Sequence, residues 1–396
     1  MQTQVKNKGV IMEKYIDILR DLIQIKSVND NEKEVAEYIQ DLFKDYDNVE
    51  TELIESYPGR DNIIVKVKGK EEGKIFALSG HLDVVEAGEG WTHDPFSGHI
   101  EDGKMYGRGT SDMKAGLAAS IYALLEILEE GADFPGEIWL LGTVGEEVGM
   151  QGALDLVEGK HLDGVDAILI SEPTKRDGEN QAIFASKGSI MYEVKAKGKA
   201  AHSSMPEIGI NAIMTIVDYI RKVQDEFDKV TANPDYQNEN LGSTINVFSI
   251  IEGGIQFNSV PDFASIKGNI RTVPEFGSEE SIKILQDAID ENNKDESNAK
   301  LSLDLVQVLD PAEADRDTDL INALKESAPD KNVQVRPLTG TCELSRYTHI
   351  SDDIQLVVYG PGLTKNAHII DEYIELDEYK DAIETFKNTA LKFLSK

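Results

Sequence analysis

Cysteine and positive charge are both scarce in this chain. One cysteine occurs in 396 residues, and 40 Lys and Arg stand against 73 Asp and Glu, which gives a formal net charge of −33. A single cysteine cannot form an intrachain disulfide, so the sequence gives no sign of a protein stabilised for an oxidising compartment. Phosphate backbones and anionic lipids repel so negative a chain, which argues against nucleic-acid and membrane partners.

Long apolar runs are also missing. No stretch approaches the ~20 apolar residues of a membrane-spanning helix, and the N-terminal segment has no apolar signal core. We therefore expect a cytoplasmic protein. Residues 1–11 precede the first helical pattern, so Met12 is an alternative start to Met1. With 40% hydrophobic residues the chain can bury a core, and its length suits two domains or one large domain.

Strand and helix patterns alternate in the N-terminal part. Short apolar runs, typical of strands buried on both faces, occur at residues 62–67, 74–79, 137–143 and 166–171. Helical spacing of apolar residues occurs between them, at 114–130 and 150–158. This order predicts an α/β domain with a mixed, mainly parallel sheet.

The pattern changes from about Lys187. Strands are expected at 189–196, 243–252, 263–271 and 300–309, with helices around 210–220 and at 279–291. The resulting β-α-β-β-α-β order is that of a small ferredoxin-like α+β sandwich. After about residue 310 a further strand, 354–359, and a closing helix, 376–393, resume the first pattern. We therefore expect an α/β domain, residues 1–187 and 309–396, interrupted by an inserted α+β domain, residues 188–308.

Acidic and histidine residues follow the strands of the α/β part. In an open α/β sheet, ligands bind beyond the C-terminal ends of the strands. Each residue alone has an ordinary explanation, such as a helix cap or a solvated face. As a set, imidazoles and carboxylates suit Zn²⁺ or a similar divalent cation. The residues at these positions are His81, Asp112, Glu146, Glu147, Glu172 and His368.

Two local spacings refine this prediction. Asp83 lies two residues after His81, so in an extended chain both side chains share a face and Asp83 can orient the imidazole. Glu146 and Glu147 are adjacent and point in different directions. One of them can therefore bind a metal ion while the other acts as general base, and the spacing leaves open which does which.

Six ordered motifs, spread over nearly the whole chain, resemble those of a known family. The family is that of the di-zinc amidohydrolases, which includes acetylornithine deacetylase, succinyl-diaminopimelate desuccinylase, aminoacylase and the glutamate carboxypeptidases. The motifs are SGHLDVV (79–85), GRGTSDMKAG (107–116), GEEVG (145–149), SEPT (171–174), AHSSMPEIGINAI (201–213) and AHIIDE (367–372).

The resemblance implies a role for each residue of the metal site. His81 and Glu172 would hold one zinc ion, Glu147 and His368 the other, and Asp112 would bridge them. Glu146 would be the general base, and Asp83 the partner of His81. The resemblance also implies a cis peptide bond between Asp112 and Met113. Two zinc ions are expected, with Co²⁺ or Mn²⁺ as alternatives.

The resemblance further implies that the inserted domain is a lid through which a homodimer forms. His202 would then stabilise the oxyanion in the active site of the neighbouring subunit, although a helix-capping role for His202 is the alternative. The implied substrate contacts are Asn258, Arg271, Gly340, Thr341, Arg346 and Lys187. The remaining histidines match no ligand position and are expected to be surface or structural residues; they are His93, His99, His161 and His349.

We therefore expect hydrolysis of the amide bond of an N-acyl amino acid. Two departures bear on the substrate: Lys187 stands where proteobacterial desuccinylases carry Arg, and the loop 339–346 lacks an Asp that many relatives carry. The preferred substrate is N-succinyl-L,L-diaminopimelate, an intermediate of lysine biosynthesis; the alternative substrates are acetylornithine and a di- or tripeptide.

Two other classes of function are open to the sequence: a non-catalytic amino-acid or peptide binding protein on the same scaffold, and an acidic metal-storage protein. The complete ligand set with Glu146 argues against the first, and ligands at separate strand ends argue against the second.

Overall fold

The computed structural model describes residues 14–176, 178–329 and 332–396. The alternative starts Met1 and Met12 lie outside these residues. The chain divides into two compact units. The large unit comprises Met1–Phe184, Ala314–Arg336 and Cys342–Lys396, and the inserted unit comprises Ala185–Glu313 and Pro337–Thr341. No sequence pattern indicated that the short segment Pro337–Thr341 returns to the inserted unit.

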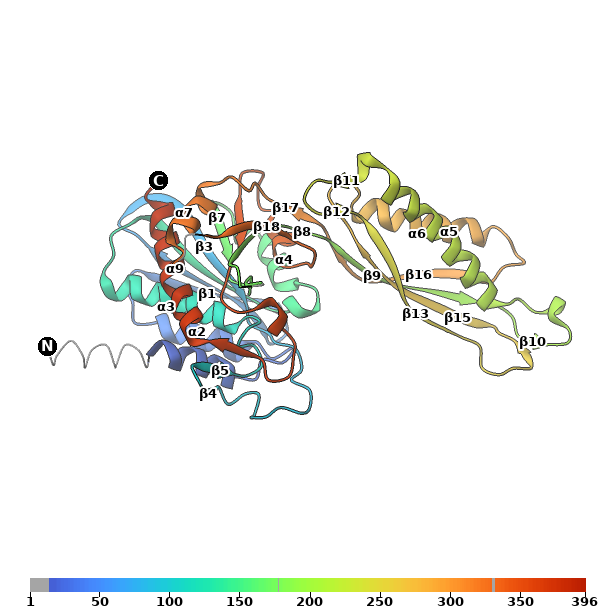
Figure 1. Ribbon diagram of the computed structural model, residues 1–396, viewed down its shortest axis with the longest axis horizontal. Coiled ribbons are helices and arrows are strands. Elements are labelled where there is room, and N and C mark those ends of the chain that lie inside the picture. The colour runs from blue at the N-terminus through green and yellow to red at the C-terminus, as the bar shows by residue number, and fades with distance from the viewer. Residues whose placement is uncertain (1–13, 177, 330–331) are drawn as a thin grey trace. The chain divides into compact units, whose positions relative to one another are not determined.

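The large unit is built on a mixed sheet (Figure 1). Four neighbouring strands, β6-β3-β7-β19, are parallel, whereas β1, β2, β8 and β17 run antiparallel to their neighbours. The strands, in sheet order, are β1 (Val49–Tyr57), β2 (Arg60–Lys68), β6 (Pro135–Thr143), β3 (Glu71–His81), β7 (Ala167–Ile170), β19 (Gln355–Val358), β8 (Gln181–Ser186) and β17 (Ala312–Glu313), with β18 (Gln334–Leu338) also paired to β8. The mainly parallel centre confirms the expected fold class.

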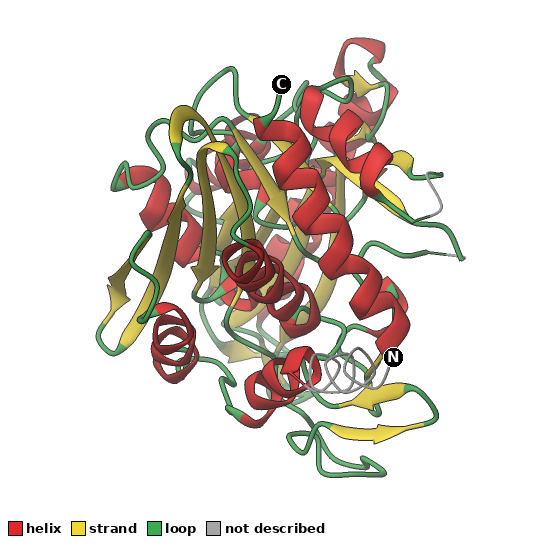
Figure 2. Ribbon diagram, turned by 90° about the vertical axis from the view of Figure 1, so that its left-hand side faces the viewer, coloured by secondary structure: helices red, strands yellow, loops and turns green. Residues whose placement is uncertain are grey.

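Helices lie against this sheet, as Figure 2 shows. Residues 14–24 are helical. The other helices are α2 (Lys33–Phe43), α3 (Lys114–Glu130), α4 (Gln151–Glu158), α7 (Asp319–Ser327), α8 (Leu344–Tyr347) and α9 (Leu376–Leu394). α3 is apolar on nearly every side because it packs between the sheet and α9, and it ends at Gly131, whose φ of +62° suits a helix C-cap. The ring of Phe393 from α9 meets that of Phe76 from β3 in the core.

A small antiparallel sheet completes the large unit. It consists of β20 (Tyr373–Glu375), β5 (Lys104–Tyr106) and β4 (His99–Glu101), in that order. This sheet joins the segment before α3 to the segment before α9, so it brings two distant parts of the sequence together.

The inserted unit is a four-stranded antiparallel sheet with two helices on one face (Figure 1). The sheet order is β13 (Ile245–Gly253), β15 (Phe263–Arg271), β9 (Ser189–Lys197) and β16 (Lys300–Leu309), and the helices are α5 (Ala212–Ala232) and α6 (Ser278–Asn293). In chain order this is the expected β-α-β-β-α-β pattern. The core holds Tyr192 and Val194 from the sheet against Phe227 and Leu285 from the helices.

Two short ribbons extend the inserted unit: β10 (Ala201–His202) pairs with β14 (Ser259–Val260), and β11 (Gln237–Asn238) pairs with β12 (Gly242–Ser243). Across both units, none of the described helices combines the length and the apolar character needed to cross a membrane.

Candidate active site

The C-terminal ends of the parallel strands gather the predicted metal-site residues of the large unit. His81 is the last residue of β3. Glu146 and Glu147 open the 3₁₀ turn Glu146–Val148, which follows β6. Glu172 comes two residues after β7. Because these strands are parallel neighbours, their ends meet at one edge of the sheet, which is where open α/β sheets bind their ligands.

The remaining two residues complete two clusters around one shared carboxylate. His81 Nε2 lies 3.2 Å from Asp112 Oδ1 and 3.6 Å from Glu172 Oε1. His368 Nε2 lies 3.4 Å from Asp112 Oδ2 and 3.0 Å from Glu147 Oε1. The two oxygens of Asp112 therefore face two different imidazoles, which is the arrangement that a bridging carboxylate needs.

The chemistry of these donors fits divalent cations. Ligand-type atoms of His81, Asp112 and Glu147 lie within 4.8 Å of one another, and so do those of His81, Glu146 and Glu172. Imidazole and carboxylate together suit Zn²⁺ and its neighbours. Proximity alone leaves both glutamates of the 146–147 pair available as ligands, but only Glu147 hydrogen-bonds to His368.

Crowded charges perturb the pKa values in this site. Burial raises the pKa of Glu146 and of Glu172 well above its usual range, and neighbouring carboxylates, including Asp112, add to both effects. Burial opposes the protonated form of His81, yet Glu172 and Asp112 raise its pKa overall. Hydrogen bonds to Asp112 and Glu147 raise the pKa of His368 to about 10. The site thus concentrates negative charge that protons or cations must neutralise.

Asp83 positions the two adjacent glutamates. Its Oδ1 accepts the backbone N–H of Glu146 at 3.1 Å, and its Oδ2 accepts that of Glu147 at 3.2 Å. His81 Nδ1 lies 2.9 Å from the backbone oxygen of Asp83 and 3.6 Å from its carboxylate. The imidazole is therefore oriented mainly by the carbonyl of Asp83, while the carboxylate fixes the turn that carries both glutamates.

Glu372 is a buried residue to which the sequence assigned no role. Its Oε1 accepts the backbone N–H groups of Ser111 at 2.7 Å and Asp112 at 3.0 Å, and its Oε2 accepts from Arg108 Nη1 at 2.6 Å. Glu372 therefore fixes the backbone of the shared carboxylate. The adjoining Asp112–Met113 peptide bond is cis, as the resemblance implied. The only sequence signal for Glu372 was its place in the same motif as His368.

A second buried carboxylate, Glu343, lies at the ends of β3 and β6. It accepts hydrogen bonds from Thr143 of β6 and from Ser79 of β3, and Ser79 also lies 2.8 Å from the hydroxyl of Tyr347. Burial raises the pKa of Glu343. These contacts join the strand that carries His81 to the strand that precedes the glutamate pair, and no sequence pattern predicted them.

Four of the predicted substrate residues meet within the inserted unit. Arg271 Nη1 donates to Thr341 Oγ1 at 3.1 Å, and Thr341 Oγ1 donates to the backbone oxygen of Lys187 at 2.8 Å. Gly340 precedes Thr341 in the same segment. Lys187 Nζ donates to Ser243 O at 2.6 Å. Burial lowers the pKa of both Lys187 and Arg271. Lys187, Arg271 and Thr341 are called the cationic cluster below.

The other predicted contacts lie elsewhere. His202 and Asn258 are exposed and neighbour each other across the β10–β14 ribbon. They lie beyond the Phe263 end of β15, whereas Arg271 is at its other end, roughly 27 Å away by the rise of an antiparallel strand. Arg346 belongs to the large unit, where its Nη2 donates to Gly149 O at 3.1 Å.

Residues 77–392 match the family model described as peptidase family M20/M25/M40. This match covers most of the chain. The chain belongs to peptidase family M20/M25/M40. Membership confirms the resemblance stated above and, with it, the class of metal-dependent amidohydrolases.

The sequences of several relatives match this chain over nearly its whole length. It is 37% identical to a Staphylococcus aureus (strain MRSA252) protein named "probable succinyl-diaminopimelate desuccinylase", with 96% of this chain and 97% of that protein covered. It is 28% identical to the protein named "succinyl-diaminopimelate desuccinylase" of Wolbachia pipientis wMel, with 96% and 95% covered. Among solved structures, an M20 family metallo-carboxypeptidase from Sulfolobus solfataricus superposes with a TM-score of 0.79 at 18% identity, covering 96% of this chain and 99% of that one, which supports the fold.

Proposed function

We propose that this M20 enzyme hydrolyses N-succinyl-L,L-diaminopimelate to succinate and L,L-diaminopimelate, a step of lysine biosynthesis in the cytoplasm. The observation that carries the proposal is the convergence of two imidazoles and the carboxylates around Asp112 in a chain 37% identical to a protein with the desuccinylase name. The family supplies the reaction class, and the relatives supply the substrate.

The metal site we propose contains two divalent cations, with zinc the best match to the donors. His81 and Glu172 would hold one, His368 and Glu147 the other, and Asp112 would be shared. Such cations would polarise the amide carbonyl and make water more acidic.

Glu146 is the general base in this proposal. The Asp83 carboxylate accepts the backbone N–H of Glu146. The Glu146 side chain lies near His81 and Glu172 and makes no hydrogen bond to His368. Burial raises its pKa, which brings a carboxylate closer to the range where it both takes and returns a proton near neutrality. Glu146 would accept a proton from the attacking water and deliver it to the nitrogen as the C–N bond breaks. The oxygen of that water ends in succinate.

The inserted unit would read the acidic substrate. N-Succinyl-diaminopimelate carries three carboxylates, and the cationic cluster of Lys187, Arg271 and Thr341 offers charge and hydrogen-bond donors together. Acetylornithine has one carboxylate and no charge on its acyl group. A partly buried cationic cluster therefore favours the succinylated substrate over the acetylated one.

A homodimer would bring His202 and Asn258 to a second active site. Both connections of the inserted unit's sheet to the rest of the chain leave beside Ser189 and Leu309, which are paired at one end of the sheet, whereas His202 is at the opposite end. We therefore assign the oxyanion contact to His202 of the partner subunit rather than to the residue of the same chain.

The decisive experiment is a hydrolysis screen on metal-loaded full-length protein. The substrates are N-succinyl-L,L-diaminopimelate, N-acetylornithine and a set of di- and tripeptides, and Glu146→Gln protein is the control for contaminating activity. We expect kcat/KM for the succinylated substrate to exceed that for acetylornithine by about 10- to 150-fold, because a charged hydrogen bond to the additional carboxylate contributes about 1.5–3 kcal/mol. Preference for acetylornithine or a peptide would overturn the substrate, and no hydrolysis of any amide would overturn the enzyme class.

A further inference from the structure

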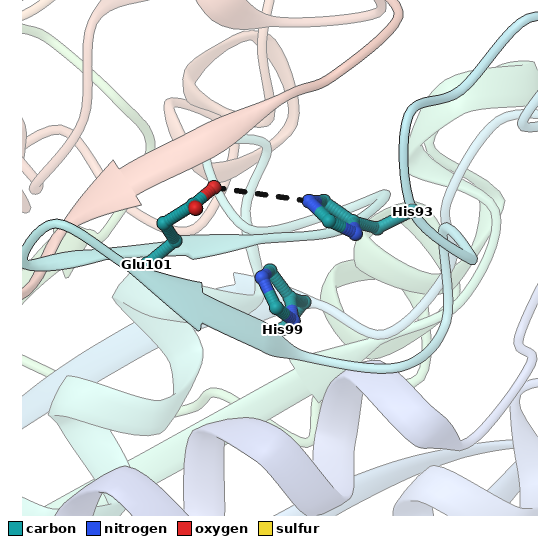
Figure 3. Close-up of side chains that lie close together, drawn as sticks. All are labelled: His93, His99 and Glu101. Carbon is teal, nitrogen blue, oxygen red and sulfur yellow. Dashed lines mark ion pairs between the residues drawn. The ribbon is translucent and has the colours of Figure 1, made fainter.

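A second group of ligand-type side chains lies outside the active site, around the strand β4. His99 and Glu101 are the first and third residues of β4, so their side chains project from the same face. His93 comes from the preceding loop. Figure 3 shows the two imidazole rings and the Glu101 carboxylate gathered beside the strand. None of the three contributes to the clusters around Asp112.

The three side chains converge closely enough to share one cation. One ligand-type atom from each lies within 4.8 Å of the other two. His93 Nε2 is 3.9 Å from Glu101 Oε2, and the rings of His93 and His99 stack with centroids 3.8 Å apart. Two imidazoles and one carboxylate are a set that Zn²⁺ and neighbouring transition metals prefer to Ca²⁺ or Mg²⁺.

The backbone that carries His93 is held in place before any cation binds. Thr92 donates to Asp371 through both its N–H and its hydroxyl, each at 2.8 Å. Asp94 accepts the N–H of Phe96 at 2.9 Å. The turn before β4 passes through Gly98, whose φ of +61° and close approach to Arg20 suit glycine. Both ends of the segment between the two histidines are therefore fixed.

The strand pairing also leaves Glu101 available. Its partner in register is Lys104, but the Lys104 ammonium is directed elsewhere, 3.3 Å from Glu375 and 4.2 Å from the centre of the Tyr373 ring. The Glu101 side chain is 60% exposed and that of His93 is 36% exposed. A cation can thus reach the group from solvent and complete its coordination with water, and the chain's net charge of −33 attracts it.

We propose that His93, His99 and Glu101 form a third, peripheral site for a divalent transition metal, with Zn²⁺ the representative ion. The proposal does not depend on the substrate or on the roles assigned within the active site. Both histidines were expected to be surface or structural residues, and their convergence with Glu101 is visible only in the folded chain.

Metal stoichiometry tests the proposal. Full-length protein freed of metal with a chelator is dialysed to equilibrium against buffered Zn²⁺, and bound zinc is measured by mass spectrometry. The test variant is His93→Ala/His99→Ala, and the matched control is His161→Ala/His349→Ala, which also removes two histidines from outside the site. We expect the control to bind one equivalent more than the test variant. Equal isotherms for the two variants would overturn the proposal.

A spectroscopic measurement separates ligation from a merely structural effect. In the Asp112→Ala background, Cu²⁺ bound at the peripheral site should show electron-paramagnetic-resonance splitting from two nitrogens. Replacing His99 with Gln should leave splitting from one nitrogen. Glu101→Gln should raise the dissociation constant for Cu²⁺ about tenfold or more, because it removes the charged ligand; tenfold corresponds to about 1.4 kcal/mol of binding free energy. Disappearance of this equivalent with Asp112→Ala alone, or unchanged splitting with His99→Gln, would show that the metal binds elsewhere.

Discussion

The active site of the large unit and the cationic cluster of the inserted unit differ in how firmly their side chains are held. In the large unit, His81 and Glu372 are fully buried, and Asp112 is held through its backbone by Glu372. In the inserted unit, Arg271 and Thr341 are only partly buried, and His202 is exposed. The first set is fixed by buried hydrogen bonds, whereas the side chains of the second set keep part of their surface exposed to solvent.

This difference matches the two functions proposed above, amide hydrolysis in the large unit and substrate selection in the inserted unit. Amide hydrolysis needs donors held within tenths of an ångström of their working positions, because misplaced catalytic groups lose most of their effect. Substrate selection can instead tolerate some adjustment on binding. Substitutions of the metal-site residues of the large unit should therefore act on kcat and metal content, and substitutions in the cationic cluster of the inserted unit should act on KM.

The largest effect is expected for Glu146. Glu146→Gln should lower kcat about 10²–10⁴-fold, the usual contribution of a general base, while bound metal remains at the wild-type level. Glu147→Gln, the matched control at the next position, should lose metal because it removes the partner of His368. Steady-state kinetics and metal analysis of both proteins decide the point. Loss of metal from Glu146→Gln but not from Glu147→Gln would mean that the two roles are reversed.

The next effect concerns the buried pair of Glu372 and Arg108. Glu372→Gln should lower the free energy of unfolding by about 3–5 kcal/mol, because it leaves the Arg108 guanidinium buried without its counter-charge. Chemical denaturation measures this change. The control is Glu375→Gln, three residues after Glu372. It removes a partly exposed ion pair with Lys104 and should change the free energy of unfolding little. Similar losses in both variants would contradict a special role for the buried pair.

The sequence predicted regular elements well where local pattern determines them. Helix 114–130 and strands 263–271 and 300–309 have the same bounds in the structure. Strand β1 was not predicted, because its alternating exposed and partly buried residues form no apolar run. Strand β8 was not predicted at all. The antiparallel direction of β2 was not predicted either, since direction depends on pairing partners and not on composition.

The candidate site shows a similar limit. Residues that follow parallel strands could be predicted to meet, because those strand ends share one edge of the sheet. The supporting contacts could not: Glu372 holds Arg108 from 264 positions away, and Glu343 holds Thr143 from 200 positions away. The convergence of Lys187, Arg271 and Thr341 likewise depends on the return of Pro337–Thr341 to the inserted unit. Such pairs depend on tertiary folding and leave no local pattern.

A smaller effect is expected in the inserted unit. Arg271→Gln should raise KM for the succinylated substrate about tenfold or more, because a charged hydrogen bond to a carboxylate contributes about 1.5–3 kcal/mol, and kcat and metal content should change little. Arg221→Gln is the matched control, since Arg221 is a 74% exposed arginine on α5 of the same unit. A fall in kcat with KM unchanged would place Arg271 among the catalytic groups and remove the contrast between the two units.

The smallest signal, a partial recovery of activity, tests whether the exposed end of the inserted unit acts on a second chain. Glu146→Gln and His202→Ala proteins should each be nearly inactive alone. In a hybrid dimer, the chain with intact Glu146 would receive His202 from its Glu146→Gln partner, so one of the two sites works. Random exchange makes half of the dimers hybrid, and about a quarter of the wild-type activity should therefore return on mixing.

Mass spectrometry of a size-tagged chain verifies exchange. The control is a mixture of Glu146→Gln and Glu147→Gln proteins, which should recover no activity because both substitutions lie in the large unit. Verified exchange without recovery would show that His202 does not act on a partner, and its hydrogen bond to Ser204, at 2.8 Å, would then be the main contact of a structural residue.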